Sequence, residues 1–344
     1  MRGSSERKMR TDFSKPLGDI APESDDWFHA DRERKLRQDA FLRAHPAALK
    51  RCICLLCGQP LAGDTFTHRQ VSYIHCGHCG HVQDEYMLPP SATADFSTVY
   101  PPLSQAEHAS RVRRVYAPKL EWIVRRLKEN GLADPLAQKW CEIGCGAGYF
   151  LDALRQAGAG AFQGIEADPA LAARARAVAG DERVLCSEDA GKAVAASTAG
   201  IYVSFFVLEH LDDPGALLDA LAAKPSGTVF AFAVPVFGLS TLLEGLFPEF
   251  AARSLDGMTH RQMFTDRSIS FLLERIGYAP AAQWVFGQDA ADAARMFRHG
   301  ARKLFPKALA GHCEEALYAM RDSLQQAVDQ NFFSDARHVL AVKS

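Results

Sequence analysis

The chain has 344 residues, of which 48% are hydrophobic and 23% are charged, as in ordinary globular proteins long enough to bury a substantial core. Its formal net charge of −2 argues against a general polyanion-binding protein. No apolar run approaches the roughly 20 residues that cross a bilayer, and the amino terminus lacks the apolar segment of a secretory signal. We therefore expect a cytoplasmic protein without membrane insertion.

The amino-terminal 48 residues are polar and charged, and they predict a partly ordered arm with a short helix at 25–44 and no strand. A cysteine-rich segment follows at 49–90. Residues 91–135 then form a predicted linker and leading helix, because proline pairs bracket 91–100 and apolar residues recur at helical spacing over 111–127.

Five of the nine cysteines lie in the segment 49–90, which predicts a small metal-binding module in a reducing compartment. Two C-x-x-C pairs, Cys54 with Cys57 and Cys76 with Cys79, form two knuckles that present four thiolates to one tetrahedral Zn²⁺ ion. Four thiolates leave no position open for water, so the predicted site is structural. A redox pair stays open as an alternative, as do other ligands: Cys52, His75, His78 and His81.

From residue 136 to residue 344, short β-rich runs alternate with helical stretches, which predicts parallel strands joined by right-handed crossovers. The predicted fold class is a Rossmann-like, doubly wound, mostly parallel α/β sheet of seven strands. The predicted strands are 139–143, 162–166, 183–186, 201–206, 228–234, 280–286 and 336–342. The predicted helices are 149–157, 170–179, 214–223 and 267–276, with a helical insert over about 288–333.

A glycine-rich turn follows the first of these strands, in the run Glu142-Ile-Gly144-Cys-Gly146-Ala-Gly148. Glycine tolerates positive φ and lets the backbone approach a ligand, so we expect no room for a side chain at Gly146. The spacing differs from the dinucleotide fingerprint, and the preceding acid would repel a pyrophosphate but attract an ammonium group. A second acid, Glu166, ends the next strand, where nucleoside-binding domains place a carboxylate on ribose hydroxyls.

With these motifs in this order, residues 139–234 resemble the class I S-adenosylmethionine-dependent methyltransferases. The resemblance implies that the glycine loop and Glu142 hold the methionine part of the cofactor and that Glu166 holds the ribose. It also implies that residues after the third strand flank the adenine and that the exit of the fourth strand lies beside the transferable methyl group. The other cofactor-binding residues that it implies are Ala167, Asp168, Ser187, Glu188, Asp189 and Phe206.

The cysteine module, from Cys54 to Gln83, resembles the zinc-binding module that precedes certain bacterial sugar C-methyltransferases and their relatives in polysaccharide and secondary-metabolite pathways. Well-known members carry a second large α/β domain after the methyltransferase domain, and too few residues remain for one here. The resemblance therefore implies a small sugar-like substrate, such as a sugar, a nucleotide sugar or a glycan precursor, and leaves C- or O-methylation open.

Methyl transfer to a hydroxyl or an acidic C–H needs an aligned nucleophile and a group that takes up its proton. His210 is the predicted base, because it follows the fourth strand and imidazole titrates near neutrality. Glu209 is a candidate to orient or replace it, and His260 lies in a segment that often closes over substrate. An alternative also stays open, in which Glu209 and His210 bind a divalent metal, as in some related O-methyltransferases.

A protein of a different class fits the same segments: a zinc ribbon that binds nucleic acid or protein, with an α/β domain that only senses the cofactor. A ribbon that reads nucleic acid needs basic and aromatic residues between its knuckles. Arg69 is the only lysine or arginine between Cys57 and Cys76, and Asp64 opposes it. The sequence therefore favours an enzyme with a small-molecule substrate over a nucleic-acid partner, and it leaves the oligomeric state open.

Overall fold

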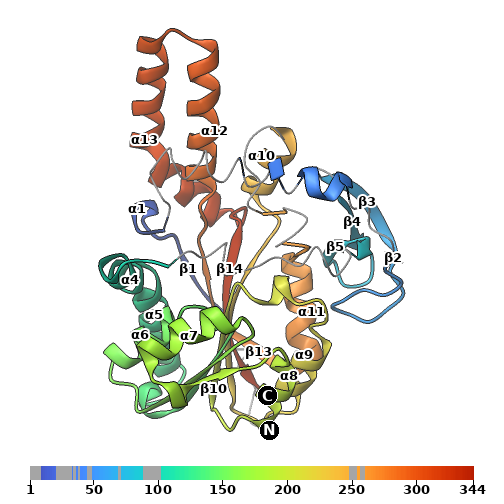
Figure 1. The fold of residues 1–344 in the computed structure, drawn as a ribbon, viewed down its shortest axis with the longest axis vertical. Coiled ribbons are helices and arrows are strands. Elements are labelled where there is room, and N and C mark those ends of the chain that lie inside the picture. The colour runs from blue at the N-terminus through green and yellow to red at the C-terminus, as the bar shows by residue number, and fades with distance from the viewer. Residues whose placement is uncertain are drawn as a thin grey trace, which may run out of the picture.

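The computed structural model describes residues 9–20, 33, 36–37, 39–44, 49–68, 71–87, 102–247, 254–255 and 260–344. Most of the helix expected at 25–44 and the first part of the linker lie outside these residues. Figure 1 shows a central sheet covered by helices, a smaller sheet beside it and a pair of helices that projects beyond one end of the central sheet. Within the described ranges, no helix combines the length and apolarity needed to cross a membrane.

The central sheet confirms the predicted α/β class, and all seven expected strands are present. In spatial order its strands are β1 (Arg10–Phe13), β13 (Tyr278–Val285), β14 (Ala336–Lys343), β11 (Val229–Pro235), β10 (Ile201–Phe205), β7 (Lys139–Ile143), β8 (Ala161–Glu166) and β9 (Val184–Cys186). Strand β14 runs antiparallel to its neighbours β11 and β13, whereas the other strand pairs of this sheet are parallel.

The amino-terminal arm supplies the eighth strand, so the prediction that the arm contains no strand is wrong. β1 pairs in parallel with β13 along its whole length. Asp12 in β1 accepts hydrogen bonds from Trp122 Nε1 (2.7 Å) and Arg126 Nε (2.8 Å) of the leading helix. These partners lie far away in the sequence, and a polar strand of four residues has no local pattern that would reveal them.

Helices cover both faces of the central sheet, and alternating side chains of its strands fill two cores. In β11, Phe230 and Phe232 face one core, whereas Val229 and Ala231 face the other. The helices that pack on the second core are α5 (Ala117–Glu129), α6 (Tyr149–Gln156) and α7 (Pro169–Ala179). Those on the first core are α8 (Ala190–Ala196), α9 (Gly215–Ala222) and α11 (Asp266–Ile276).

The leading helix begins earlier than expected and is interrupted by one π-helical turn. It runs from α4 (Gln105–Arg111) through η2 (Val112–Tyr116) into α5. Ser104 and Glu107 form a capping box, in which Glu107 N donates to Ser104 Oγ (3.3 Å) and Ser104 N donates to Glu107 Oε2 (2.8 Å). Short helices of the described residues include α1 (Leu17–Ile20), η3 (Pro135–Ala137), η4 (Asp181–Arg183) and η5 (Leu208–His210).

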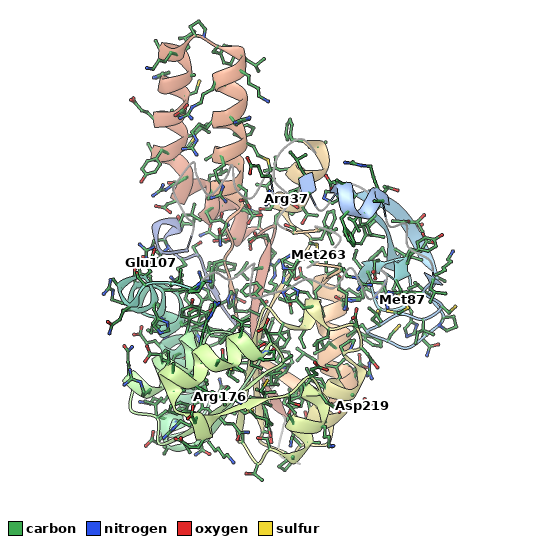
Figure 2. All side chains as sticks on the ribbon, viewed as in Figure 1. Arg37, Met87, Glu107, Arg176, Asp219 and Met263 are labelled. Carbon is green, nitrogen blue, oxygen red and sulfur yellow. The ribbon has the colours of Figure 1, made fainter. Side chains whose placement is uncertain are left out.

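The cysteine-bearing segment forms an antiparallel sheet that takes one strand from the carboxyl-terminal half of the chain. In order its strands are β12 (Gln262–Met263), β5 (Val82–Asp84), β4 (Val71–Cys76) and β3 (Gly63–His68), and β2 (Leu49–Lys50) pairs separately with β6 (Tyr86–Met87). Met263, labelled in Figure 2, is fully buried against Tyr73 and Val82. Asp84 joins the two parts further, because it accepts hydrogen bonds from Arg51 Nε (2.8 Å) and Arg261 Nε (2.8 Å).

The predicted helical insert is an antiparallel helix pair, α12 (Asp289–Leu304) and α13 (Lys307–Gln330). Its base is held by buried polar contacts with α10 (Leu239–Leu246): Ser240 N donates to Asp289 Oδ1 (2.8 Å). Figure 1 shows the outer half of the pair standing clear of the sheets.

Candidate functional site

The carboxyl ends of four parallel strands bring most of the predicted cofactor residues to one edge of the central sheet. The strand order reverses between β7 and β10, and open α/β sheets bind their ligands in the crevice at such a switch point. The glycine loop follows β7, and Phe206 follows β10. Glu166 ends β8, and Ser187 follows β9. Residues from four separate segments therefore lie at this edge of the sheet.

The glycines of the loop have three different surroundings, although φ is positive at all of them: 69° at Gly144, 54° at Gly146 and 81° at Gly148. A Cβ at Gly144 would lie 2.5 Å from Val207 Cγ2, and one at Gly148 would lie 2.9 Å from Ala175 Cα. A Cβ at Gly146 would meet no atom within 4 Å. The expectation that Gly146 has no room is therefore wrong for the protein alone; its open side faces away from the packed chain, where a ligand can approach the backbone.

Glu166 links the second strand to the glycine loop. Its Oε2 accepts a hydrogen bond from Gly146 N (2.7 Å), and its Oε1 accepts one from Asp168 N (2.9 Å). Burial raises the pKa of this carboxyl, and the backbone N–H donors oppose the rise. Because each carboxylate oxygen accepts more than one hydrogen bond, Glu166 retains acceptor capacity for a ribose hydroxyl.

Glu142 is a buried acid with unused acceptor capacity. It is 3% exposed, and its Oε2 has no hydrogen-bond partner among the described residues. Burial, followed by repulsion from Glu166, raises its pKa well above the ordinary range. A cation would stabilise its charged form, so this position fits the ammonium group of a methionine moiety.

Lys119 is a buried lysine near the same edge of the sheet, and the sequence analysis missed it. It is 4% exposed, and its Nζ lies 5.3 Å from the ring centre of Tyr116, 4.7 Å from that of Phe205 and 5.0 Å from that of Phe206. Burial, followed by repulsion from nearby cationic side chains, lowers its pKa to about 7. The signal in the sequence is a lysine on the apolar face of the leading helix, three residues after Tyr116.

Phe206 has a strained backbone at the point where the fourth strand of the domain ends. Its φ is 58°, which is uncommon for a bulky residue, and its N–H donates to Ala233 O (2.8 Å). Strain of this kind persists where the surrounding structure imposes it, and it is frequent at functional sites. The ring is thereby directed towards Lys119 at the edge of the crevice.

Two of the predicted cofactor residues act as helix caps. Asp168 Oδ1 accepts two backbone hydrogen bonds at the start of α7 (2.7 and 3.0 Å), and Asp189 Oδ1 accepts one at the start of α8 (2.8 Å). Capping explains both acids without a ligand. Ala167 and Glu188 are exposed next to them, so the structure places both near the crevice without a contact that defines a role.

The structure brings the three predicted catalytic residues together. Glu209 and His210 lie on η5 (Leu208–His210), and one ligand-type atom from each of Glu209, His210 and His260 lies within 4.8 Å of the others. His210 Nε2 is 4.0 Å from Glu209 Oε1, and the two imidazole ring centres are 4.9 Å apart. Because Val207 packs on Gly144, this cluster adjoins the glycine loop.

Glu209 is fully buried, and neither of its carboxylate oxygens has a hydrogen-bond partner among the described residues. Burial raises its pKa to about 8. The cluster therefore suits two kinds of chemistry. A protonated Glu209 can orient His210 for proton transfer, or a divalent ion can be held by the carboxylate and the imidazole nitrogens.

The four predicted metal-binding cysteines form one compact group, with all four sulfur atoms within 4.8 Å of one another. Cys54 Sγ is 3.6 Å from Cys79 Sγ, and Cys57 Sγ is 3.9 Å from Cys76 Sγ. These values match the edges of about 3.8 Å of a tetrahedron with metal–sulfur bonds of ~2.3 Å. Burial, followed by the nearby Cys54, raises the pKa of Cys57 to about 11, because clustered thiolates repel one another without a cation.

The alternative ligands lie outside this group. Cys52 is exposed, and the described part of the chain places no fifth side chain within the cluster. His81 is buried with its Nε2 2.9 Å from Gln262 Oε1, and the His78 ring packs edge-on against Phe271. These contacts give both histidines structural partners, so the four cysteines are the candidate donors.

The cysteine module contacts the segment that carries His260. Gln262 pairs with β5 in the smaller sheet, and its Nε2 donates a hydrogen bond to Leu211 O. Arg261 Nη1 is 3.0 Å from Asp212 Oδ1. These contacts hold the two segments that carry the catalytic cluster: the one that ends at β12 and the one that follows η5.

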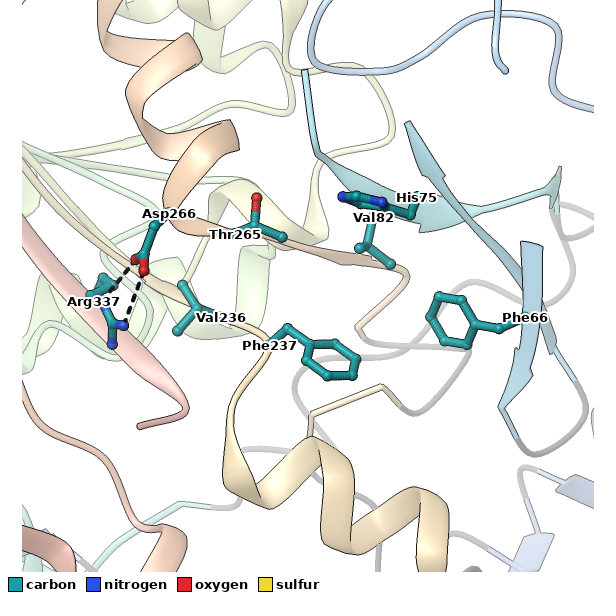
Figure 3. A pocket seen from close by; sticks show the side chains of 8 residues that line it. All are labelled: Phe66, His75, Val82, Val236, Phe237, Thr265, Asp266 and Arg337. Carbon is teal, nitrogen blue, oxygen red and sulfur yellow. Dashed lines mark hydrogen bonds and ion pairs between the residues drawn. The ribbon is translucent and has the colours of Figure 1, made fainter. Parts of the chain in front are cut away.

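A cavity of about 410 Å³ separates the cysteine module from the end of β11 (Figure 3). Phe66 and Phe237 come from opposite sides of it, and His75 adds a polar group. Arg337 lines one end, where its guanidinium is paired with Asp266 (Nε to Oδ1, 3.0 Å). A mainly apolar and aromatic lining with few polar groups suits a compact small molecule.

The fold, the glycine loop and the two acids behind it define a class I S-adenosylmethionine-dependent methyltransferase domain. A profile of the family described as "Methyltransferase domain" matches residues 108–283, just over half of the chain. The chain belongs to this family and is an S-adenosylmethionine-dependent methyltransferase.

Three solved structures illustrate what the chain is similar to. Magnesium protoporphyrin IX methyltransferase from Synechocystis PCC 6803, with bound SAH, is 15% identical, with 72% of this chain and 93% of that chain covered and a TM-score of 0.44. Geranyl diphosphate methyltransferase in complex with SAM is 10% identical, with coverages of 73% and 96% and a TM-score of 0.41. A SAM-dependent methyltransferase from Archaeoglobus fulgidus is 17% identical, with coverages of 65% and 94% and a TM-score of 0.40. No curated protein matches the chain.

Proposed function

We propose that this methyltransferase acts on a small sugar-like molecule, such as a sugar, a nucleotide sugar or a glycan or secondary-metabolite precursor. The cluster of Glu209, His210 and His260 beside the glycine loop carries the proposal, since it offers a base next to the cofactor edge. Two features support a compact substrate: the resemblance of the cysteine module to that of sugar C-methyltransferases, and the aromatic cavity next to this module.

S-Adenosylmethionine, when bound, supplies a methyl group on a sulfonium that becomes neutral as the acceptor attacks. In our proposal Glu142 pairs with its ammonium group, Lys119 with its carboxylate, and Glu166 with the ribose hydroxyls. Residues 187–189 flank the adenine, and Phe206 borders the methyl position. His210 takes up the proton of the acceptor, Glu209 orients the imidazole, and His260 borders the acceptor.

We propose that Cys54, Cys57, Cys76 and Cys79 hold one structural zinc ion. The compact spacing of their sulfur atoms supports this ion, because two of the distances match the edges of a tetrahedral zinc–thiolate site. In this proposal residues 49–90 are a scaffold that positions His260 for the domain at 136–344. Thiolate ligation agrees with a reducing compartment, so the cytoplasm remains our proposed location.

A second candidate mechanism places a divalent cation between Glu209, His210 and His260. The specific observation in its favour is the buried carboxylate of Glu209, whose two oxygens accept no hydrogen bond in the described part of the chain. Such an ion would polarise a substrate hydroxyl and replace the base. It requires O-methylation, whereas a base alone also serves an acidic C–H.

Detection of S-adenosylhomocysteine from a panel of unlabelled acceptors tests the proposed substrate class. We expect turnover with nucleotide sugars or related glycan precursors and none with RNA. Turnover with RNA alone would overturn the substrate class and leave the methyltransferase assignment intact.

Glu166→Ala is expected to weaken S-adenosylhomocysteine binding by about 1.5–3 kcal/mol, since a charged acceptor of hydrogen bonds is lost. Gly146→Arg is expected to abolish binding, because its side chain would fill the open space in front of the loop. Calorimetry measures both effects, with the exposed Glu182→Ala as a matched control. Tight NAD binding without a response to S-adenosylhomocysteine would contradict the cofactor assignment.

Binding of S-adenosylhomocysteine is expected to protonate Lys119 above about pH 7, and the comparison with Lys119→Met separates this uptake from the proton that Glu142 releases when it pairs with the ammonium group. In the ligand-free protein the pKa of Lys119 is about 7, and the carboxylate of the bound ligand raises this pKa. Affinity is therefore full below that pH and falls as the pH rises through the higher pKa of the complex. Calorimetry in two buffers of different ionisation enthalpy measures the uptake. Lys119→Met should take up fewer protons than wild type and the exposed Lys192→Met should not differ from it; equal proton uptake by wild type and Lys119→Met would refute the role.

A further inference from the structure

The outer end of the projecting helix pair carries exposed apolar side chains. Leu304 is 76% exposed, Phe305 50% and Leu309 56%. The last eight residues of α12 extend for about 12 Å, and the pair holds the connection between its helices away from the sheets (Figure 1). Adjacent large apolar side chains at the tip of a projection are typical of an interaction surface.

Positive charge gathers at the same end. Residues 298–309 contain four basic residues, Arg298, Arg302, Lys303 and Lys307, and no acidic residue. Arg302 is paired with Glu314 of α13, whose Oε1 lies 2.6 Å from Arg302 Nε. Lys303 and Lys307 are exposed on either side of the connection. In a chain with a net charge of −2, this is a local cationic end.

We propose that the hairpin tip, residues 303–309, docks the enzyme peripherally on an anionic membrane surface. Apolar side chains flanked by lysines fit this partner, because the former enter the boundary of headgroups and acyl chains while the latter remain at lipid phosphates. A symmetric contact with a second copy would bring like charges together. Nucleic acid would match the lysines but offers no apolar phase for Leu304 and Leu309.

Flotation of the purified full-length enzyme with lipid vesicles tests this proposal. We expect binding to vesicles of phosphatidylcholine mixed with phosphatidylglycerol, and none to phosphatidylcholine alone. Lys303→Gln with Lys307→Gln should weaken binding about 25-fold, at about fivefold per charge. Leu304→Ser with Phe305→Ser should weaken it about tenfold or more. Added salt should weaken wild-type binding, because it screens the lysines.

The matched control is Tyr318→Ser with Met320→Ser, which removes two exposed apolar residues (55% and 52%) nearer the base of α13 and should leave vesicle binding unchanged. Thermal unfolding and turnover of a soluble acceptor should be unchanged in all variants. The proposal would be overturned if the enzyme bound both vesicle types equally. It would also be overturned if the tip variants bound vesicles as tightly as the wild-type enzyme does. If the wild-type enzyme does not bind vesicles but forms a dimer or binds RNA, and the tip variants lose this dimer in light scattering or this RNA binding, the tip contacts that partner. Either result would also overturn the proposal.

Discussion

His210→Ala is expected to lower kcat about 10²–10⁴-fold and to leave the affinity for S-adenosylhomocysteine nearly unchanged. The imidazole lies at the exit of β10, beside buried Glu209, whereas the residues proposed to hold the cofactor lie on the glycine loop, β8 and the leading helix. The wild-type rate should rise with pH as the base loses its proton, and the variant should lose this rise. Steady-state kinetics and calorimetry measure the two effects.

Chelators and a Glu209→Gln variant distinguish a His210 base from a divalent metal ion at this site. If His210 is the base, chelators have no effect and Glu209→Gln, which keeps a neutral polar side chain beside the imidazole, retains much of the activity. If a divalent ion is bound, a chelator abolishes turnover, Mg²⁺ restores it, and Glu209→Gln is inactive although the cysteine-bound zinc stays in place. His312→Ala, an exposed histidine on α13, is the matched control. A fully active His210→Ala enzyme would contradict both mechanisms.

Cys76→Ser is expected to release the zinc and to lower both the unfolding temperature and the solubility of the protein. Cys76 is buried in one hydrophobic cluster with residues of α9 and α11, so loss of the metal disturbs the core of the catalytic domain as well as the module. Removal of one thiolate from a closed structural site also removes folding free energy. Elemental analysis and thermal unfolding measure the outcome, and wild-type protein should contain one zinc per chain without added metal.

Loss of zinc should also lower kcat, since β12, which begins two residues after His260, pairs with β5 of the cysteine module. We expect kcat to fall more than cofactor affinity in any Cys76→Ser protein that remains folded. Cys52→Ser is the matched control, because Cys52 is exposed and lies outside the cluster. A metal-free wild-type protein that is folded and fully active would refute the structural role of zinc.

The sequence by itself determined the features that have a local physical signal. The spacing of apolar residues predicted the alternating strands and helices of the parallel sheet, because each element repeats its buried face at its own period along the sequence. Turn chemistry predicted the glycine loop, since positive φ at Gly144 and Gly148 excludes most other residues. The spacing of the two C-x-x-C pairs likewise predicted the compact group of four sulfur atoms.

Only the tertiary structure decided which distant segments meet. It placed β1 on the sheet edge through hydrogen bonds from Trp122 and Arg126 to Asp12, and it turned Lys119 towards three aromatic rings. It also brought His260 to His210, fifty residues earlier in the chain, with the cysteine module as the brace. These contacts depend on the packing of whole elements, and neither hydrophobic period nor local turn chemistry encodes such packing.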